Sequence, residues 1–566
     1  MKQIILFVLL FASFAGFAQV TNEFEPRSWS MIEKSSVQMT PVILPAVDVD
    51  ALIEEDQEIA KTKFNKALRV GEDIEVDLDL YNSGSWTTLK NGDRLWRLNV
   101  VAKGAKFTRA IFDLYSLPEG AEMYLYNNDK SDRIGPYTSN ENQEDGILGS
   151  WIIEGDNLWI EYYEPARVKG LGRLSVSSIT YGYIDLFKKN DGFAKLNESG
   201  SCNVDVLCNP NTGSPGIKDW STARDNHINS VARILIPRGN QAFLCTGSII
   251  NSTAQNATPY FLTANHCLDT FEGAGSSFNA NNWTFGFQWY ANDSDKRCAS
   301  FQATGASNPV PVRILTGAQL KANNDDSDVA LFLLNQNPPR AWNLYYAGWD
   351  RSGAIPTQQL GVHHPRGDIM KISRNDQAAD LTTIVFNGQN QTLTWKVADW
   401  DYGVTEGGSS GSFLLNQDDQ IIGQLAGGGA ECLGTTDNGD PDFYGRFDVS
   451  WNSGLNASTR LRDWLDPSAT GAITQKGAYY QTLSSDEIIK PSLEIKIYPN
   501  PSTGLYIIES ELPTTYQVYN LNGQLMINGS TSVTSDQLDL TPVATGLYFI
   551  KITAGNQTIT RKLVKQ

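Results

Sequence analysis

Histidine and basic residues are scarce in this sequence. Four histidines occur in 566 residues, and 45 lysines and arginines are outnumbered by 63 aspartates and glutamates, which gives a net charge of −18. A polyanionic backbone repels so acidic a chain, which argues against nucleic acid as a partner. The sequence also contains no C-x-x-C pair, so a zinc site built from cysteine and histidine is disfavoured. We predict neither a metal nor a cofactor.

A long apolar run is missing everywhere beyond the N-terminus. Lys2 is followed by an apolar stretch at 4–14 and then by the small residues Gly16 and Ala18. This pattern predicts a secretory signal peptide, residues 1–18, that is cut after Ala18. Since no later run of 18 apolar residues exists, we expect a soluble mature protein outside the cytoplasm.

Cysteine is confined to the middle of the chain. The six positions are Cys202, Cys208, Cys245, Cys267, Cys298 and Cys432. An even number of cysteines in an exported chain indicates disulfides rather than zinc ligands. Six cysteines permit many pairings, and the residues alone do not decide among them.

Strands dominate the expected secondary structure. Glycine (48 residues) and proline (23 residues) are frequent, which favours β-structure with many turns. Period-two alternation predicts strands at 74–82, 94–103, 121–128 and 157–165, behind a more helical lead at 48–69, and again at 231–237, 245–250, 259–264, 329–334 and 411–416. Residues 458–467 predict a helix that Pro467 ends.

These patterns divide the chain into five parts and predict a mainly β fold. The expected order is a signal peptide (1–18), an N-terminal β-sandwich or jelly roll without cysteine or histidine (19–195), a middle domain with every cysteine and histidine (196–476), a polar linker (477–493) and a small C-terminal β-sandwich (494–566). In the last part, Asn522-Gly523 between alternating runs predicts a hairpin.

The stretch EGGSSGSFLL at 406–415 is consistent either with a flexible linker or with a turn that presents a nucleophile. A serine nucleophile needs a histidine base and a group that orients this base. His266 has the best context, because it follows the apolar run PYFLTA and precedes Cys267. The other interpretation is a structural histidine at the end of a strand.

An orienting carboxylate is offered by NNDDSDVALFLLN. Of Asp325, Asp326 and Asp328, only Asp328 directly precedes the apolar strand. An aspartate that leads into a buried strand is costly unless it is paired, and His266 is a suitable partner. The alternatives are an aspartate that caps the strand and a calcium loop, although the segment lacks the glycine and the final glutamate of an EF-hand.

Together these segments resemble chymotrypsin-fold serine proteases, which have the order His, Asp, Ser, and more closely the bacterial lysyl endopeptidases. The resemblance covers nearly all of 197–472 and includes SGSCNVDV, LCTGSIIN, YFLTANHC, VHHPRGDIMKIS, GVTEGGSSGS, IIGQLAGG, FYGRF and LRDWLDPSATGA. It implies a chymotrypsin-like double β-barrel with a C-terminal helix. It also implies that His266 is the general base, that Asp328 orients it, and that Ser410 is the nucleophile.

The same resemblance implies the surroundings of this triad. The N–H groups of Gly408 and Ser410 would form the oxyanion hole, and disulfides would join Cys202 to Cys432, Cys208 to Cys298 and Cys245 to Cys267. Asp442 would lie at the bottom of the specificity pocket, with Leu425 and Gly427 as further substrate-binding residues, and protein or peptide substrates would be cut after lysine. Asp437 and Asp440 are expected to be turn residues, and His363 and His364 to be structural.

Two departures from the family pattern bear on specificity. Ala426 stands where the family has a histidine, and the segment from Cys432 to Asp442 is one residue longer. A trypsin-like enzyme that accepts both lysine and arginine is therefore one alternative. A surface adhesin whose protease-like barrel only binds is another.

The flanking parts suggest how the enzyme is processed and exported. Ser409, which is uncharged, stands where mammalian trypsins have the aspartate of their activation switch. Control is therefore expected from the N-terminal domain, as a propeptide cut after Lys195 so that a monomeric active protein begins near Leu196. The C-terminal segments IYPNPSTG, VYNLNGQLM and LTPVATGLYFIKI resemble the type A sorting domain that the type IX secretion machinery uses. A carbohydrate-binding or adhesive sandwich is the alternative there.

Overall fold

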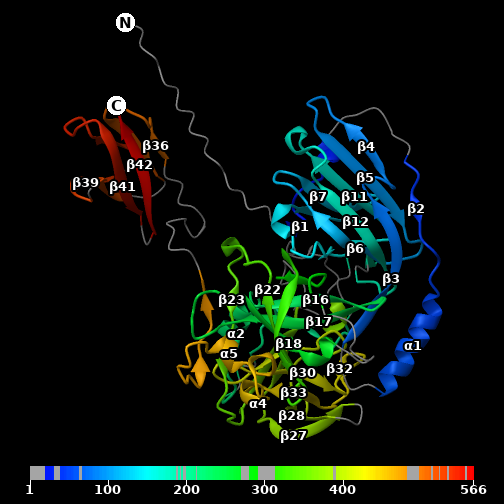
Figure 1. Ribbon diagram of the computed structural model, residues 1–566. Helices are drawn as coiled ribbons and strands as arrows, with labels where there is room; N and C mark the ends of the chain where they lie inside the picture. Colours follow the sequence, from blue (N-terminus) through cyan, green and yellow to red (C-terminus); the bar gives the residue numbers. More distant parts are fainter. Residues whose placement is uncertain are drawn as a thin grey trace. The chain divides into compact units, whose positions relative to one another are not determined.

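A computed structural model provides the fold (Figure 1). It describes residues 20–30, 39–62, 67–186, 189–190, 193–194, 199–211, 213, 215–268, 279–290, 313–386, 390–480, 496–510, 514–521, 523–531, 535–554 and 557–566. The chain forms two compact units, residues 1–481 and residues 482–566. Strands predominate in both, and the mainly β prediction is confirmed. In the described part, no helix has the length and apolar character needed to cross a membrane.

The N-terminal region, defined here as residues 20–194, consists of two antiparallel sheets. One sheet contains β4 (Ser85–Thr88), β5 (Arg94–Val101), β11 (Asn157–Glu164), β7 (Glu122–Asn127) and β8 (Arg133–Tyr137) in that order. The other contains β3 (Leu68–Asp79), β12 (Arg173–Gly182) and β6 (Phe107–Ser116). Apolar residues alternate along these strands and meet in one core. The predicted helical lead is α1 (Val49–Thr62).

The middle region, defined here as residues 199–480, begins with a second group of strands. Its order is β21 (Ala318–Asn324), β22 (Val329–Leu334), β18 (Tyr260–Ala264), β17 (Gln241–Ile250), β16 (Val231–Arg238), β19 (Thr284–Phe287) and β20 (Arg313–Thr316). Their inward side chains include Phe261, Phe285 and Phe332, which pack around the buried Cys245 and Cys267.

The second half of the middle region is another antiparallel sheet. Its order is β26 (Lys371–Asn375), β25 (Gln359–His363), β29 (Phe413–Leu415), β30 (Ile421–Gly428), β33 (Asp442–Arg446), β28 (Asn390–Val397) and β27 (Asp380–Phe386). Because 406–415 leads into β29, whose residues are buried, this stretch is not a free linker.

Two boundaries differ from the sequence-based expectation. Residues 477–493 are not all linker, because β35 (Ala478–Tyr479) pairs with β23 (Tyr345–Tyr346) of the middle region. A helix was expected at 458–467, but the structure has only a single helical turn there, α5 (Arg462–Leu465). A 3-10 turn, η7 (Ala457–Thr459), precedes it. Trp464 Nε1 donates to the carbonyl of Ala457, so part of this segment is held by side-chain contacts rather than by helical ones.

The N-terminal and middle regions share a sheet. β3 pairs with β17, and β1 (Val20–Thr21) pairs with β20. The core of the N-terminal region also continues into Leu235, Leu244, Trp289 and Ile369 of the middle region. The two regions are therefore one folded body rather than two domains joined by a linker.

The C-terminal unit is a small β structure with its own core. It contains β36 (Lys496–Tyr498), β37 (Leu505–Glu509) and β40 (Ser535–Asp539) in one sheet, and β39 (Leu525–Thr531), β38 (Thr514–Asn520), β41 (Gly546–Ala554) and β42 (Gln557–Lys565) in the other. β38 and β39 form the predicted hairpin, and Gly523 has a φ of 77°. Asn522 itself lies outside the described residues.

Candidate active site

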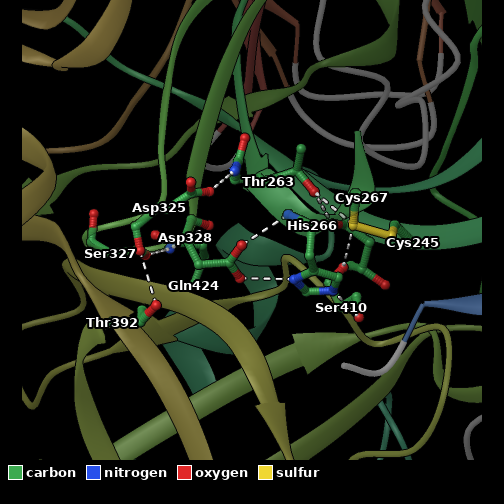
Figure 2. Close-up of polar contacts among 12 residues, drawn as sticks. Cys245, Thr263, His266, Cys267, Asp325, Ser327, Asp328, Thr392, Ser410 and Gln424 are labelled. Carbon is green, nitrogen blue, oxygen red and sulfur yellow. Dashed lines mark hydrogen bonds and ion pairs between the residues drawn. A yellow bond between two sulfur atoms is a disulfide. The ribbon is translucent and has the colours of Figure 1, made fainter. Parts of the chain in front are cut away.

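His266 is presented by a strand end that a disulfide holds in place. It lies in η4 (Asn265–Cys267), a single 3-10 turn directly after β18. Cys267 is bonded to Cys245 of β17, and Thr263 Oγ1 donates to the carbonyl of Thr246 on the same strand. The imidazole thus projects from backbone that is fixed on both sides (Figure 2).

Asp328 reaches His266 from the neighbouring strand. β18 and β22 are paired so that Ala264 lies opposite Val329, which places the residues just beyond them side by side. One carboxylate oxygen of Asp328 accepts the backbone N–H of His266 at 2.8 Å, and the other lies 2.8 Å from Nδ1 of the ring. This double contact fixes both the position and the rotation of the imidazole (Figure 2).

The backbone at Asp328 is itself unusual. Its φ is 53°, a left-handed conformation that aspartate tolerates better than most residues. Its carbonyl accepts hydrogen bonds from Asn265 N at 2.8 Å and from Gln424 Nε2 at 3.1 Å. Gln424 belongs to β30, so both halves of the middle region help to hold this aspartate.

Ser410 lies on a turn that only glycines permit. Gly408 and Gly411 have φ values of 94° and 81°. A Cβ at Gly411 would lie 2.5 Å from the carbonyl of Thr246, so the loop could not approach β17 this closely with a larger residue. In this position the Ser410 carbonyl accepts from Thr246 N at 2.8 Å, and its Oγ lies 2.7 Å from His266 Nε2.

The three side chains form a continuous hydrogen-bonded line in a site shielded from water. His266, Asp328 and Ser410 are all buried. Burial raises the pKa of Asp328, while the adjacent His266 counteracts this rise. An ionised Asp328 that accepts the Nδ1 proton leaves Nε2 free to take a proton from the serine hydroxyl.

Two backbone N–H groups at Ser410 and Gly408 are available to a negatively charged oxygen. Neither Gly408 N nor Ser410 N donates a hydrogen bond to any other described residue, whereas Ser409 N, between them, donates to the carbonyl of Glu406 at 3.0 Å. A Cβ at Gly408 would lie 2.9 Å from the carbonyl of His364. This crowding explains why glycine is required at the turn that exposes these donors.

Asp442 begins β33 and is completely buried. Its Oδ2 accepts hydrogen bonds from Trp400 Nε1 at 2.8 Å and Thr405 Oγ1 at 2.5 Å. The opposite residue in the sheet is Gly428, and any side chain there would collide with the carboxylate. The carboxylate is thus held in place by two uncharged donors.

The other expected substrate-binding residues have different surroundings. Leu425 N donates to Ser412 O, and the Leu425 carbonyl accepts from Gly411 N. The backbone of Leu425 therefore holds the nucleophile loop. A bulge separates Leu425 from Gly427, which lies opposite Phe443. Ala426, at the bulge, is buried.

His363, which was expected to be structural, lies beside the site. His363 Nδ1 lies 2.9 Å from Ser409 Oγ, and its Nε2 lies 2.7 Å from Ser373 Oγ. His363 thus anchors Ser409, the neighbour of Ser410, and the sequence did not identify this partner. Burial lowers the pKa of His364 to about 3, and its Nδ1 lies 2.9 Å from the carbonyl of Asp368, which fits the structural role predicted for it.

The cysteines are used for cross-links rather than for a metal. Cys245, His266 and Cys267 lie close together, but both sulfurs belong to the disulfide and carry no thiolate for a metal ion. Cys202 is bonded to Cys432, as the resemblance implied. Cys208 is also disulfide-bonded. Its expected partner Cys298 and the processing positions Ala18 and Lys195 lie outside the described residues.

Two parts of the chain match known protein families. Residues 196–445 match the family described as "Lysyl endopeptidase, C-terminal domain", and residues 496–566 match "Secretion system C-terminal sorting domain". A lysyl endopeptidase of Pseudomonas aeruginosa is 29% identical over 391 residues, which are 66% of this chain and 76% of that protein.

Similar solved structures include two proteases. An M. tuberculosis protease in its active form is 17% identical, with 44% of this chain and 97% of that one covered and a TM-score of 0.26. A thermostable serine protease, AL20, from an extremophilic microorganism is 14% identical, with 39% and 92% covered and a TM-score of 0.27. The chain is a secreted serine endopeptidase, whose residues 196–445 are similar to the lysyl endopeptidase C-terminal domain and whose residues 496–566 are similar to the secretion system C-terminal sorting domain.

Proposed function

We propose that this enzyme hydrolyses peptide bonds after lysine, with Ser410 as nucleophile, His266 as general base and Asp328 as the residue that orients the base. The observation that carries the proposal is the unbroken line from Asp328 Oδ2 to His266 Nδ1 and from His266 Nε2 to Ser410 Oγ, with distances of 2.8 and 2.7 Å.

The geometry supports a two-step reaction. Ser410 Oγ attacks the carbonyl carbon while its proton passes to His266 Nε2, and the resulting oxyanion is stabilised by Gly408 N–H and Ser410 N–H. The C–N bond then breaks as His266 gives this proton to the leaving amine, which leaves an acyl ester on Ser410. A water molecule, deprotonated by His266, hydrolyses the ester and restores the serine.

Asp442 supports the preference for lysine. A buried carboxylate attracts a cationic side chain strongly because little water screens the charges. Trp400 and Thr405 hold this carboxylate through Oδ2, and the substrate ammonium is expected to bind the same carboxylate. The second candidate is a pocket that accepts arginine equally well, since Ala426 provides no bulk beside Gly427. Cleavage of a mixed peptide library, scored by the residue before each cut, separates the two.

Replacing the nucleophile tests the assignment of the triad. Ser410→Ala is expected to lower kcat by roughly 10⁶-fold, to background, because no other described serine hydroxyl lies beside His266 Nε2. Ser412→Ala, a matched control in the same loop, should stay near the wild-type rate. Peptidase activity above background in purified Ser410→Ala would contradict the assignment.

A serine-directed organofluorophosphate distinguishes an enzyme from a pure binder. It reacts only with a serine that a base activates. Wild-type protein is expected to be labelled at Ser410, and Ser410→Ala to remain unlabelled. Absence of labelling in the processed wild-type protein would favour a binding role for the same fold.

A further inference from the structure

One edge of β17 is used by three different segments in succession. β16 pairs with the other edge from Gln241 to Ser248. On the edge opposite β16, β3 pairs with Gln241–Leu244. Thr246 N then donates to the carbonyl of Ser410, and β18 pairs with Ser248–Ile250. The N-terminal region therefore reaches the same strand edge as the nucleophile loop, with its pairing ending two residues before Thr246.

β3 is held firmly in this position. Gly71 lies opposite Ala242 of β17 on one side and Gly182 of β12 on the other. The pairing is extended by Asp73 N, which donates to the carbonyl of Asn240 at 2.7 Å. Strand β3 thus links the sheet of the N-terminal region to that of the middle region.

Helix α1 and the shared core reinforce the attachment. Arg69 of β3 is buried and donates to Asp56 Oδ1 at 2.7 Å and to the carbonyl of Leu52 at 3.0 Å, both on α1. Leu244, which lies opposite Leu68 of β3, belongs to the apolar core of the N-terminal region. A cut in the connecting chain leaves all of these contacts intact.

With the pocket proposed at Asp442, the occupied edge is expected on the leaving-group side of the site. A lysine that points to Asp442 brings the preceding substrate residues to β30, whose Gly428 lies opposite Asp442. The residues after the cut bond must depart from the other side of the attacked carbonyl. There lie Thr246 and the Cys245–Cys267 disulfide of β17, followed by Leu244.

We propose that β3 is an autoinhibitory strand, which occupies the edge of β17 at Gln241–Leu244 that an extended peptide substrate needs on its leaving-group side. Extended peptides bind proteins by adding a strand to an exposed sheet edge, and a paired edge has no main-chain groups left to offer. The inhibition persists after cleavage at Lys195 until the N-terminal region separates. The inference rests on the proposed roles of Ser410 and Asp442.

A reversible cross-link tests this. Glu72 and Gln241 are directly opposite each other and partly exposed, so Glu72→Cys with Gln241→Cys can form a disulfide across the β3–β17 pair. Ser85→Cys with Arg97→Cys, opposite within the N-terminal region, is the matched control. Each full-length variant is cut after Lys195, oxidised, diluted, and assayed before and after mild reduction.

Two substrates distinguish a block of the leaving-group side from a general loss of activity. One is a lysyl p-nitroanilide, with no residue after the cut bond, and the other is a peptide with several residues after lysine. In the oxidised Glu72→Cys, Gln241→Cys protein we expect kcat/KM for the long peptide to be at least about tenfold lower than in the oxidised control. The kcat/KM for the anilide should be the same in both proteins. Reduction of the disulfide should restore kcat/KM for the long peptide.

Two results would overturn the inference. One is equal hydrolysis of the long peptide by both oxidised variants. The other is an equal loss for the anilide and the peptide, which would place the block elsewhere. If the anilide is not hydrolysed even by the reduced control, the proposed function fails first and the inference fails with it.

Discussion

At the residue scale, the site combines three buried groups whose neighbours are almost all uncharged. Asp328 is held by the backbone of His266, Ser409 by His363, and Asp442 by Trp400 and Thr405. Fixed, desolvated dipoles need little reorganisation during reaction. Substitution of any one should therefore change catalysis more than folding.

Asp442→Asn tests the charge in the pocket. The amide keeps the shape of the carboxylate but loses its charge, so kcat/KM for lysyl substrates should fall about 100-fold or more. Asp440→Asn, at an exposed turn nearby, is the control and should have little effect. Initial rates on lysyl, arginyl and uncharged substrates give the comparison. Undiminished lysine preference in Asp442→Asn would show that the pocket lies elsewhere.

Asp328→Asn tests the orientation of His266. An amide nitrogen can donate to Nδ1 and so favour the tautomer that leaves no acceptor at Nε2, which lowers kcat by about 10⁴-fold in a triad of this kind. Unchanged circular dichroism would exclude unfolding as the cause. A variant that retained the wild-type kcat would refute the assigned role.

At the element scale, a short turn joins the N-terminal and middle regions through a buried acid. Glu141 ends η2 (Ser139–Glu141), where its Oε2 accepts from Thr138 N at 2.6 Å and its Oε1 from Gln336 Nε2 at 3.2 Å. Burial raises the pKa of Glu141 to about 7. Gln336 belongs to the middle region, so this acid lies at the contact between the two regions.

The stability of the folded body should consequently decrease between about pH 4.5 and pH 7. In this window the folded chain retains the proton of Glu141 while the unfolded chain has lost it, so the free energy of unfolding falls as pH rises. A pKa of Glu141 that rises from 4.5 to about 7 corresponds to roughly 3 kcal/mol of stability. Thermal unfolding of wild type and Glu141→Gln across this pH range tests the prediction. The difference in stability between the two proteins should grow with pH, and parallel curves of stability against pH would contradict the role of Glu141.

At the scale of the whole molecule, we expect the N-terminal region to be removed by cleavage and the C-terminal unit to direct export. We propose that the enzyme cuts itself after Lys195. Ser410→Ala should then accumulate uncut, while wild type starts at or near Leu196. N-terminal sequencing of both proteins provides the measurement, and identical processing of the mutant would indicate a different protease.

The C-terminal unit is proposed to engage the type IX secretion machinery. A reporter fused to residues 490–566 should be exported by a cell that has this machinery and retained by one that lacks it. Leu538 and Ile550 lie in the core of the unit, so Ile550→Asp should unfold it and abolish export. Retention of the intact fusion together with sugar binding would favour the adhesive alternative.

The sequence alone determined which residues are available for catalysis. Four histidines left few choices for a base, and the order of His266, Asp328 and the 406–415 serines suggested the chemistry, because local patterns of apolar and glycine residues reflect local backbone demands. The strands at 74–82, 231–237 and 329–334 were predicted for the same reason, since alternation is a local property.

Only the tertiary structure decided how distant segments meet. The left-handed backbone at Asp328, the contact of His363 with Ser409 and the use of Leu425 to hold the nucleophile loop all depend on neighbours far away in sequence. The pairing of β3 with β17 turned an expected separate domain into part of one sheet. Such pairings join strands that are far apart in the sequence. Which strands pair depends on packing and hydrogen bonding between them, and a local sequence pattern contains no information about these contacts.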